Sequence, residues 1–410
     1  MKSSSIFLWL LVLTGTLVIF GVVMMSSVSA LYSYKLMVGK YGEEYCQVHN
    51  CNNFYYLRHI EHILLGIPVL LAGLLIPLRV WKRVAMPFFL GTLLILFLLL
   101  IGDIGGNWGT AKSWINIPGL PSIQPSEIMK LAIIFYLAIW MDKKQRVVQS
   151  WGNGFLPFSL LMIPPVFLLA LQPDFGSLLV IASIAAVMFF VAGGNLAHIF
   201  LGGVLAFLLA FIPIMMADNC DDPLQRDKFC YISERITGFL GNGEEGRENY
   251  QVKQSLIAVG SGGLFGVGLG ESVQRYGYLP EIQSDTIFAA TAEELGFLRM
   301  IFVVGAFALF SFLGFQVSHN ARNRFEMLVA AGITAWIMFQ ALINMAVVLK
   351  LFPVTGITLP FISYGGSSML SLLFATGILL RIAQFSSGHA HTSSRRRIGR
   401  AYFTRTRRRR

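Results

Sequence analysis

The chain carries little charge for its length: Lys, Arg, Asp and Glu together make up 13% of its 410 residues. Soluble proteins carry about 25%, so this scarcity excludes an ordinary soluble protein. Acid is absent from the last 16 positions, which contain nine arginines. The other 394 residues hold 23 basic and 21 acidic groups. The sequence is therefore a nearly neutral apolar body followed by a basic tail.

Long apolar runs fill most of the body. A transmembrane helix needs about 20 mostly apolar residues, and the sequence predicts an all-α polytopic membrane protein with about ten transmembrane helices. One large extracytoplasmic loop is expected at 217–285, within a membrane domain at 1–385, and 386–410 form a basic cytoplasmic tail. The predicted spans are 6–29, 57–78, 84–101, 124–141, 155–172, 176–193, 196–216, 286–314, 326–350 and 367–385.

Basic residues between the spans indicate the orientation, because Lys and Arg in short loops stay cytoplasmic. Basic clusters follow the second, fourth, eighth and tenth spans: 79–83, 143–146, 322–324 and the tail. All four fall on one side if both termini are cytoplasmic in a bacterial inner membrane. The first apolar run also has features of a cleaved signal peptide, although its length of about 20 exceeds the usual 7–15.

Cysteine is scarce as well, and the four present form two local pairs, Cys46 with Cys51 and Cys220 with Cys230. Both pairs fall on the predicted outer side, where disulfides persist. The sequence predicts two local bridges, with four free thiols as the alternative. A metal site is disfavoured, because no Cys-x-x-Cys spacing occurs and only His49 is near.

Ionisable groups inside the predicted spans are few and gather in the outer half of the bundle. Glu127 and Lys130 stand three residues apart on one helix face, so they can pair with each other or clamp an anionic head group. Asp174 and Asp285 lie at outer span ends. An ion-coupled transporter keeps its ionisable site near the midplane, so the pattern favours a polar cavity open to the outer leaflet. Simple snorkelling to the interface is the alternative.

Two further segments are unusual for a membrane protein. The run 260–270 contains six glycines but lacks the Gly-Lys-Ser/Thr of a phosphate-binding loop, so it predicts a structural loop with close backbone approach. The segment 353–366 holds two prolines and three glycines, which preclude a regular helix. Non-helical backbone at membrane depth is tolerated where it is buried or lines a cavity.

Four motifs, in this order, resemble the SEDS family of bacterial proteins (FtsW, RodA and SpoVE). They are Gln124-Pro-Ser-Glu127 with Lys130, Gln172-Pro-Asp174, the glycine run, and Leu359-Pro-Phe-Ile-Ser-Tyr-Gly-Gly-Ser-Ser368. The resemblance implies a ten-span peptidoglycan glycosyltransferase that polymerises lipid II outside the membrane. The Gly-Val-Gly-Leu-Gly and Tyr-Leu-Pro-Glu segments are more similar to the division protein FtsW than to the elongation protein RodA.

The resemblance also implies a catalytic acid at the end of the large outer loop, which is Asp285 here. The residues around it depart from the family's His-Thr-Asp-Phe-type motif, and Ser113 stands where the family usually has Arg. We expect Asp285 to act as general base, with an N-cap of the eighth span as the alternative. Lys130 would stabilise the pyrophosphate and Glu127 would orient Lys130. The other expected substrate-binding residues are Gln124, Trp114, Lys112, Asp174, Gln254, Ser363, Tyr364 and Ser367.

The implied partners are lipid II, a class B penicillin-binding protein transpeptidase, other divisome proteins and the membrane, with no nucleic acid. A divalent cation, Mg or Mn, would assist at the pyrophosphate, but no ligand cluster in the sequence demands one. The alternatives are a lipid II flippase, a RodA-like enzyme of lateral wall elongation, and a non-catalytic division scaffold. A flippase needs polar groups along the whole membrane depth, whereas this sequence places them on one side.

Overall fold

The computed structural model describes residues 3–101, 106–108, 111–115, 122–145, 147–204 and 247–386. Over these residues the chain is a bundle of helices with one small two-stranded sheet. Long apolar runs are expected to form helices, because a bilayer offers no water to bond the backbone N–H and C=O groups, and a helix bonds them to each other. The helices are α1 (Ser3–Val28), α2 (Ala30–Tyr41), α3 (Glu43–Val48), α4 (Phe54–Leu75), α5 (Leu78–Ile101), α6 (Pro125–Lys143), α7 (Leu156–Leu171), α8 (Phe175–Val191), α11 (Arg247–Ser261), α12 (Ile287–His319), α13 (Arg324–Val348) and α14 (Gly366–Ser386).

The described helices confirm the predicted class of an all-α polytopic membrane protein. Within the described ranges, seven helical segments are long and apolar enough to cross a membrane: those that contain α1, α4, α5, α7, α12, α13 and α14. The helix α8 is apolar but shorter, and α6 carries Glu127 and Lys130 within its span. Nine of the ten predicted spans therefore coincide with a helix. The remaining one, 196–216, is helical as far as residue 204, where the described residues stop.

The centre of the bundle is α13, which packs against α6, α8, α12 and α14. Its Trp336 side chain is fully buried, whereas α1, α4 and α5 present large apolar side chains such as Leu64 to the outside. Small residues bring α4 and α14 into backbone contact: a Cβ on Gly73 would lie 2.4 Å from the Phe374 oxygen, and one on Gly377 would lie 2.1 Å from the Leu70 oxygen. Such close packing is typical of membrane helices.

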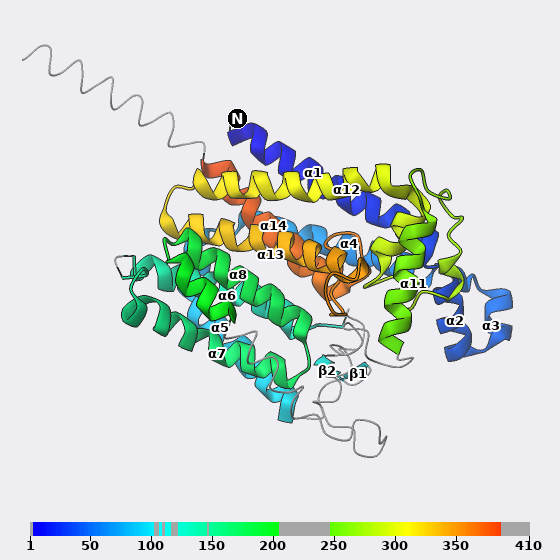
Figure 1. The fold of residues 1–410 in the computed structure, drawn as a ribbon, viewed down its shortest axis with the longest axis horizontal. Helices are drawn as coiled ribbons and strands as arrows, with labels where there is room; N and C mark the ends of the chain where they lie inside the picture. Colours follow the sequence, from blue (N-terminus) through cyan, green and yellow to red (C-terminus); the bar gives the residue numbers. More distant parts are fainter. Residues whose placement is uncertain are drawn as a thin grey trace, which may run out of the picture.

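The basic segments meet at one end of the bundle, where α1 begins, α12 turns into α13 and α14 ends (Figure 1). Lys82 at the start of α5 pairs with Asp142 at the end of α6 at 2.8 Å. The guanidinium of Arg322 lies over the Phe385 ring of α14 at 4.6 Å. The charge pattern predicted that these segments share one side, and the described residues place them together. The tail itself lies outside the described residues.

The opposite end carries α2, α3, α11, the sheet and the segment 351–365 (Figure 1). The helices α2 and α3 form an arm that is joined to the start of α4 by the predicted disulfide between Cys46 and Cys51. The Ser33 hydroxyl on α2 also accepts the backbone N–H of Tyr55 on α4 at 3.1 Å. The second predicted pair, Cys220 with Cys230, lies outside the described residues. The antiparallel strands β1 (Gly106–Trp108) and β2 (Ala111–Trp114) were not predicted from the sequence.

Candidate active site

The segment 353–365, called here the outer loop, is bonded directly to the turn that precedes α12. The backbone N–H of Tyr364 donates to the Gln283 carbonyl at 2.8 Å. The Ser363 hydroxyl donates to the next carbonyl, that of Ser284, at 2.6 Å. The side-chain amide of Asn344 on α13 donates to the third, that of Asp285, at 2.8 Å. Three consecutive carbonyls are thus held from two directions, which fixes the backbone of the expected catalytic residue.

Asp285 is half-buried and lies in the turn before α12. The N-cap position of that helix is the next residue, Thr286, which makes no side-chain capping bond. Both roles of Asp285, general base and helix cap, stay predictions. Its carboxylate lies beside the outer loop: a Cβ on Gly356 would be 3.6 Å from the Asp285 Oδ2. A methyl group at that distance would make an ordinary contact, so it is the φ of +69° at Gly356 that favours glycine there.

The Glu127–Lys130 pair is formed as the spacing predicted. The Lys130 Nζ lies 2.7 Å from the Glu127 Oε1, and the two side chains are 1% and 6% exposed. The ammonium also donates to Gln340 on α13 at 3.2 Å and lies 5.4 Å from the centre of the Trp336 ring. Glu127, Gln340 and Trp336 therefore enclose the Lys130 ammonium, which is shielded from solvent. Its direct contact with a substrate stays a prediction.

Gln340 connects the buried pair to the outer loop. Its side-chain oxygen accepts from Lys130 and from the Trp336 indole, the latter at 2.7 Å. Its nitrogen donates to the Thr358 carbonyl at 3.1 Å and to the Ser368 hydroxyl at 3.3 Å. One amide therefore spans from the charged pair on α6 to the loop and to the start of α14.

A second group of predicted residues meets where α6, α8 and α14 begin. The Gln124 amide donates to the Asp174 Oδ2 at 3.2 Å, and its backbone N–H donates to the Ser367 hydroxyl at 3.0 Å. The other oxygen of Asp174 caps α8 by accepting from the Ser177 N–H at 3.1 Å. Gly176 allows α8 to approach the outer loop, since a Cβ there would lie 2.7 Å from the Thr355 carbonyl. Asp174 and Asp285 therefore flank the same loop.

The ring of Tyr364 turns from the outer loop toward α4. It makes an edge contact with Tyr55 at 5.0 Å and a tilted contact with His62 at 5.4 Å. Burial raises the pKa of the Tyr364 hydroxyl above its ordinary value of 10.0, so the phenol stays neutral at physiological pH. Tyr364 thus joins the loop to α4 by packing as well as by its backbone bond to the turn.

Three other predicted residues lie apart from this network. Trp114 is half-buried on β2. Gln254 is half-buried on α11, and its side chain makes no hydrogen bond with another described residue. The strand β2 includes Lys112, whose side chain lies outside the described residues. Their roles toward a substrate stay predictions.

The glycine run, 260–270, packs against α12, the helix that follows Asp285. It is a structural loop and not a phosphate-binding loop. The N–H groups of Val267 and Gly268 donate to the carbonyls of Glu293 and Glu294 at 3.0 and 3.1 Å. The helix α12 is interrupted at Gly296, whose φ is +75°. A Cβ at Gly296 would lie 2.1 Å from the Gly266 nitrogen. The run therefore folds into the break in α12, one glycine against another.

Two buried carboxylates hold this support in place. Glu293 accepts from the Ser272 hydroxyl and from the Val273 backbone N–H, the latter at 3.2 Å. Glu294 accepts from the Ser27 hydroxyl of α1 at 2.6 Å. Burying a carboxylate is costly unless donors meet it, and both have them. These acids bind α1 and the glycine run to the helix that follows Asp285.

Sequence reasoning missed Gln340 and Asn344. They are four residues apart on α13, so they lie on one face of that helix. A signal was present: two carboxamides spaced by one helical turn in an otherwise apolar span are expensive unless each is bonded. Over the described residues, no group of three or more His, Cys, Asp and Glu side chains is positioned to hold a metal ion. No described residue is therefore assigned as a ligand of the expected divalent cation.

The fold and this network define a polytopic membrane protein with a polar site at one end of its bundle. The sequence model of the family described as "Cell cycle protein" (FtsW, RodA and SpoVE) matches residues 7–388. The chain is 36% identical to the probable peptidoglycan glycosyltransferase FtsW of Geobacter sulfurreducens over 376 residues, 91% of this chain and 94% of the relative. It is 40% identical to the stage V sporulation protein E of Bacillus subtilis over 312 residues, 75% and 80% of the two chains.

Solved structures share the fold. A chain from a study of how a peptidoglycan synthase complex coordinates polymerization and crosslinking superposes with a TM-score of 0.71 at 23% identity, covering 92% of this chain and 97% of that one. The rod shape determining protein RodA of Thermus thermophilus superposes with a TM-score of 0.60 at 24% identity, covering 92% and 95%. The chain belongs to the FtsW/RodA/SpoVE family.

Proposed function

We propose that this protein polymerises lipid II into glycan strands at the outer face of the cytoplasmic membrane, for septal wall synthesis in cell division. The general activity follows from the family: the chain is a peptidoglycan glycosyltransferase. The observation that carries the finer proposal is the binding of the outer loop and α13 to the backbone of 283–285. That arrangement holds one half-buried carboxylate, Asp285, beside Gly356 of the outer loop.

The proposed chemistry joins the 4-hydroxyl of one sugar to the anomeric carbon of another. The hydroxyl oxygen attacks the anomeric carbon, the carbon–oxygen bond to the pyrophosphate breaks, and polyprenyl pyrophosphate leaves. Asp285 takes the hydroxyl proton as general base, a role that needs a carboxylate within reach of the acceptor. The half-buried Gln124 and Asp174 orient the sugars from the α8 side of the outer loop. The buried hydroxyls of Ser363 and Ser367 hold the loop and the start of α6 in place for them.

Lys130 is proposed to offset the negative charge that develops on the leaving pyrophosphate. Its present partners are Glu127 and Gln340. For contact with phosphate, the ammonium has to exchange one of these oxygen ligands for a phosphate oxygen. Glu127, which stands one helical turn away, holds the Lys130 side chain toward α13 until that exchange.

The septal assignment and the partner rest on the relatives. The names of the relatives include probable peptidoglycan glycosyltransferase FtsW in Geobacter, Coxiella and Bacillus species. A structural neighbour comes from a peptidoglycan synthase complex. We therefore propose a class B penicillin-binding protein as the partner, with both termini of this chain in the cytoplasm. A tagged copy that gathers at the division site, and not along the lateral wall, supports the septal role.

The decisive assay uses purified protein and lipid II, alone and with a partner transpeptidase. Wild type is expected to form glycan polymer, and Asp285→Ala is expected to form none. Asp142→Asn, which changes an acid at the opposite end of the bundle, is the control and keeps activity. Polymerisation by Asp285→Ala at the wild-type rate rejects the catalytic assignment. If wild type forms no polymer but moves lipid II across liposomes, the flippase alternative holds, and if it does neither, the scaffold alternative holds.

A further inference from the structure

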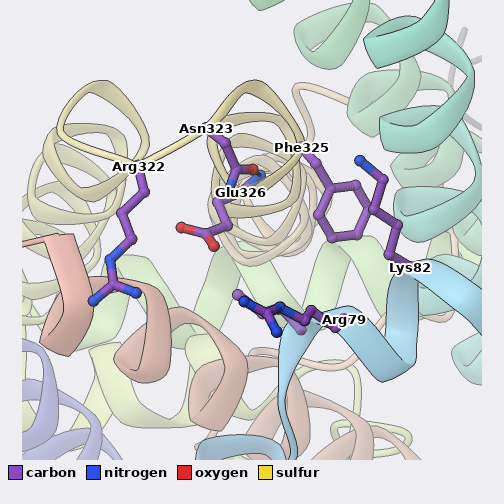
Figure 2. Close-up of a pocket in the computed structure, with 7 residues that line it drawn as sticks. Arg79, Lys82, Arg322, Asn323, Phe325 and Glu326 are labelled. Carbon is purple, nitrogen blue, oxygen red and sulfur yellow. Dashed lines mark hydrogen bonds between the residues drawn. The ribbon is translucent and has the colours of Figure 1, made fainter.

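A cavity of about 460 Å³ opens at the basic end of the bundle, at the other end of α13 from the outer loop. Its size falls within the range of small-molecule sites, about 300–1,000 Å³. It lies between the start of α5 and the turn from α12 to α13 (Figure 2). The side chains that line it include Leu78, Arg79, Lys82, Arg322, Phe325 and Glu326.

All three cations in this pocket retain hydrogen-bond donors, and the two arginines are the ones without an acidic partner among the described residues. Lys82 is already paired with Asp142 at 2.8 Å and lies 5.2 Å from the centre of the Phe325 ring. Arg79 makes no hydrogen bond or ion pair with any described residue. Arg322 uses its Nε for the Phe385 carbonyl and leaves its terminal nitrogens unbonded within the described part of the chain. The two guanidinium groups therefore present donors to the cavity.

Glu326 brings the opposite charge into the same space. Figure 2 shows its carboxylate pointing between Arg322 and Arg79. It forms no ion pair with either of them, and its Oε2 is buried without a hydrogen-bond partner in the described residues. A buried carboxylate oxygen without a donor is costly. The pocket thus needs an anion for its arginines and, a short distance away, a cationic donor for its glutamate.

We propose that this pocket binds the head group of a phospholipid that carries both a phosphate and a primary amine, as phosphatidylethanolamine does. The phosphate lies between Arg79 and Arg322, whose planar groups match phosphate oxygens, and the ammonium meets Glu326. An apolar side chain next to the lining suits a lipid: the Phe385 ring, which lies 4.6 Å from the Arg322 guanidinium, is 38% exposed. An acidic lipid without an amine leaves Glu326 facing a second negative charge.

A lipid bound in this pocket would contact both the α4–α5 connection, through Arg79, and the α12–α13 turn, through Arg322 and Glu326. These two connections are about 240 residues apart in the sequence. The site does not depend on the outer loop or on Asp285, so it is independent of the proposed glycosyl transfer. Failure of one proposal leaves the other standing.

The test counts bound lipids by native mass spectrometry on the delipidated full-length protein in detergent. The probes are short-chain phosphatidylethanolamine, phosphatidylglycerol and the water-soluble glycerophosphoethanolamine. Wild type is expected to retain phosphatidylethanolamine at least about tenfold better than phosphatidylglycerol, and Arg79→Ala to weaken it by about tenfold, the effect of one charge-assisted hydrogen bond. Glu326→Gln is expected to lose the preference for the amine while still binding phosphatidylglycerol. Arg83→Ala, which removes a nearby exposed arginine outside the pocket, is the matched control and changes nothing.

Three results overturn the proposal. Retention by Arg79→Ala equal to that of wild type removes the phosphate contact. A preference for phosphatidylethanolamine that survives in Glu326→Gln removes the amine contact. Complete displacement of the lipid by an equal concentration of glycerophosphoethanolamine identifies a soluble ligand in place of a membrane lipid.

Discussion

The side-chain amide nitrogen of Asn344 donates to the carbonyl of Asp285 at 2.8 Å and to that of Ile357 at 2.7 Å. One nitrogen on the central helix thus ties the turn before α12 to the outer loop. Asn344 is 2% exposed, so water does not replace it. The position of the proposed catalytic carboxylate depends on this amide more directly than on any other side chain in α13.

Asn344→Ala should therefore damage catalysis more than stability. The change leaves two buried carbonyls without a donor, which we expect to cost about 1–3 kcal/mol in the free energy of unfolding. A shift of Asp285 by about 1 Å should lower kcat by about 100-fold, with a smaller effect on KM. Thermal unfolding and lipid II turnover measure the two effects. Thr334→Val on the same helix, whose hydroxyl bonds only its own helix, is the control, and an Asn344→Ala enzyme as fast as this control contradicts the prediction.

The Glu127–Lys130 pair allows its structural and chemical roles to be separated. Lys130→Met alone leaves a buried carboxylate without its cation and should destabilise the fold by about 3–5 kcal/mol. Glu127→Gln combined with Lys130→Met removes both charges and should recover most of that stability. If Lys130 serves the leaving pyrophosphate, the stable double variant remains slow in glycan polymerisation. A double variant with the wild-type rate would show that the pair is only structural.

Gly296 and Gly260 form a matched pair of glycine substitutions. Gly296→Ala places a methyl group against the Gly266 nitrogen at a φ of +75°, and we expect it to destabilise the protein by more than about 3 kcal/mol through overpacking and strain. Gly260→Ala meets nothing within 4 Å in α11 and should stabilise that helix by up to about 1 kcal/mol. Thermal melts in detergent measure both changes. Equal melting temperatures for the two variants would refute the role assigned to the break in α12.

The Cys46–Cys51 disulfide should stabilise the arm of α2 and α3 locally. Closing so short a loop contributes about 2 kcal/mol in the chain-entropy model, and the arm is distant from the Glu127–Lys130 pair. The double variant Cys46→Ser, Cys51→Ser should show faster amide hydrogen exchange in α3 and an unchanged rate of lipid II polymerisation. A loss of polymerisation with normal exchange in α3 would place the arm in the catalytic machinery.

The sequence predicted the features that depend on local pattern. Apolar runs located the helices, and the pair at 127 and 130 followed from helical spacing alone. Basic residues predicted that three connections, 79–83, 143–146 and 322–324, share one end of the bundle, because their charge excludes them from the membrane core. The resemblance identified Asp285, Gln124 and the outer loop by their motifs.

Other features depend on contacts between distant segments and were missed for that reason. The bonds from 363–364 to the carbonyls of 283–284 join segments about 80 residues apart, and no local pattern encodes which carbonyl meets which donor. Gln340 and Asn344 were overlooked because each is a single polar residue in an apolar helix. Their importance appears only when α6, the outer loop and the turn before α12 are placed around α13.

The arm, α4 and the outer loop form a mechanically continuous unit. The arm is bonded to α4 through Ser33 and the disulfide, Tyr55 of α4 carries the Tyr364 ring, and Tyr364 is bonded to the turn that holds Asp285. Further along, α4 and α14 touch backbone to backbone and cannot slide independently. A protein that displaces the arm from outside should therefore also displace the outer loop beside the proposed catalytic carboxylate of Asp285.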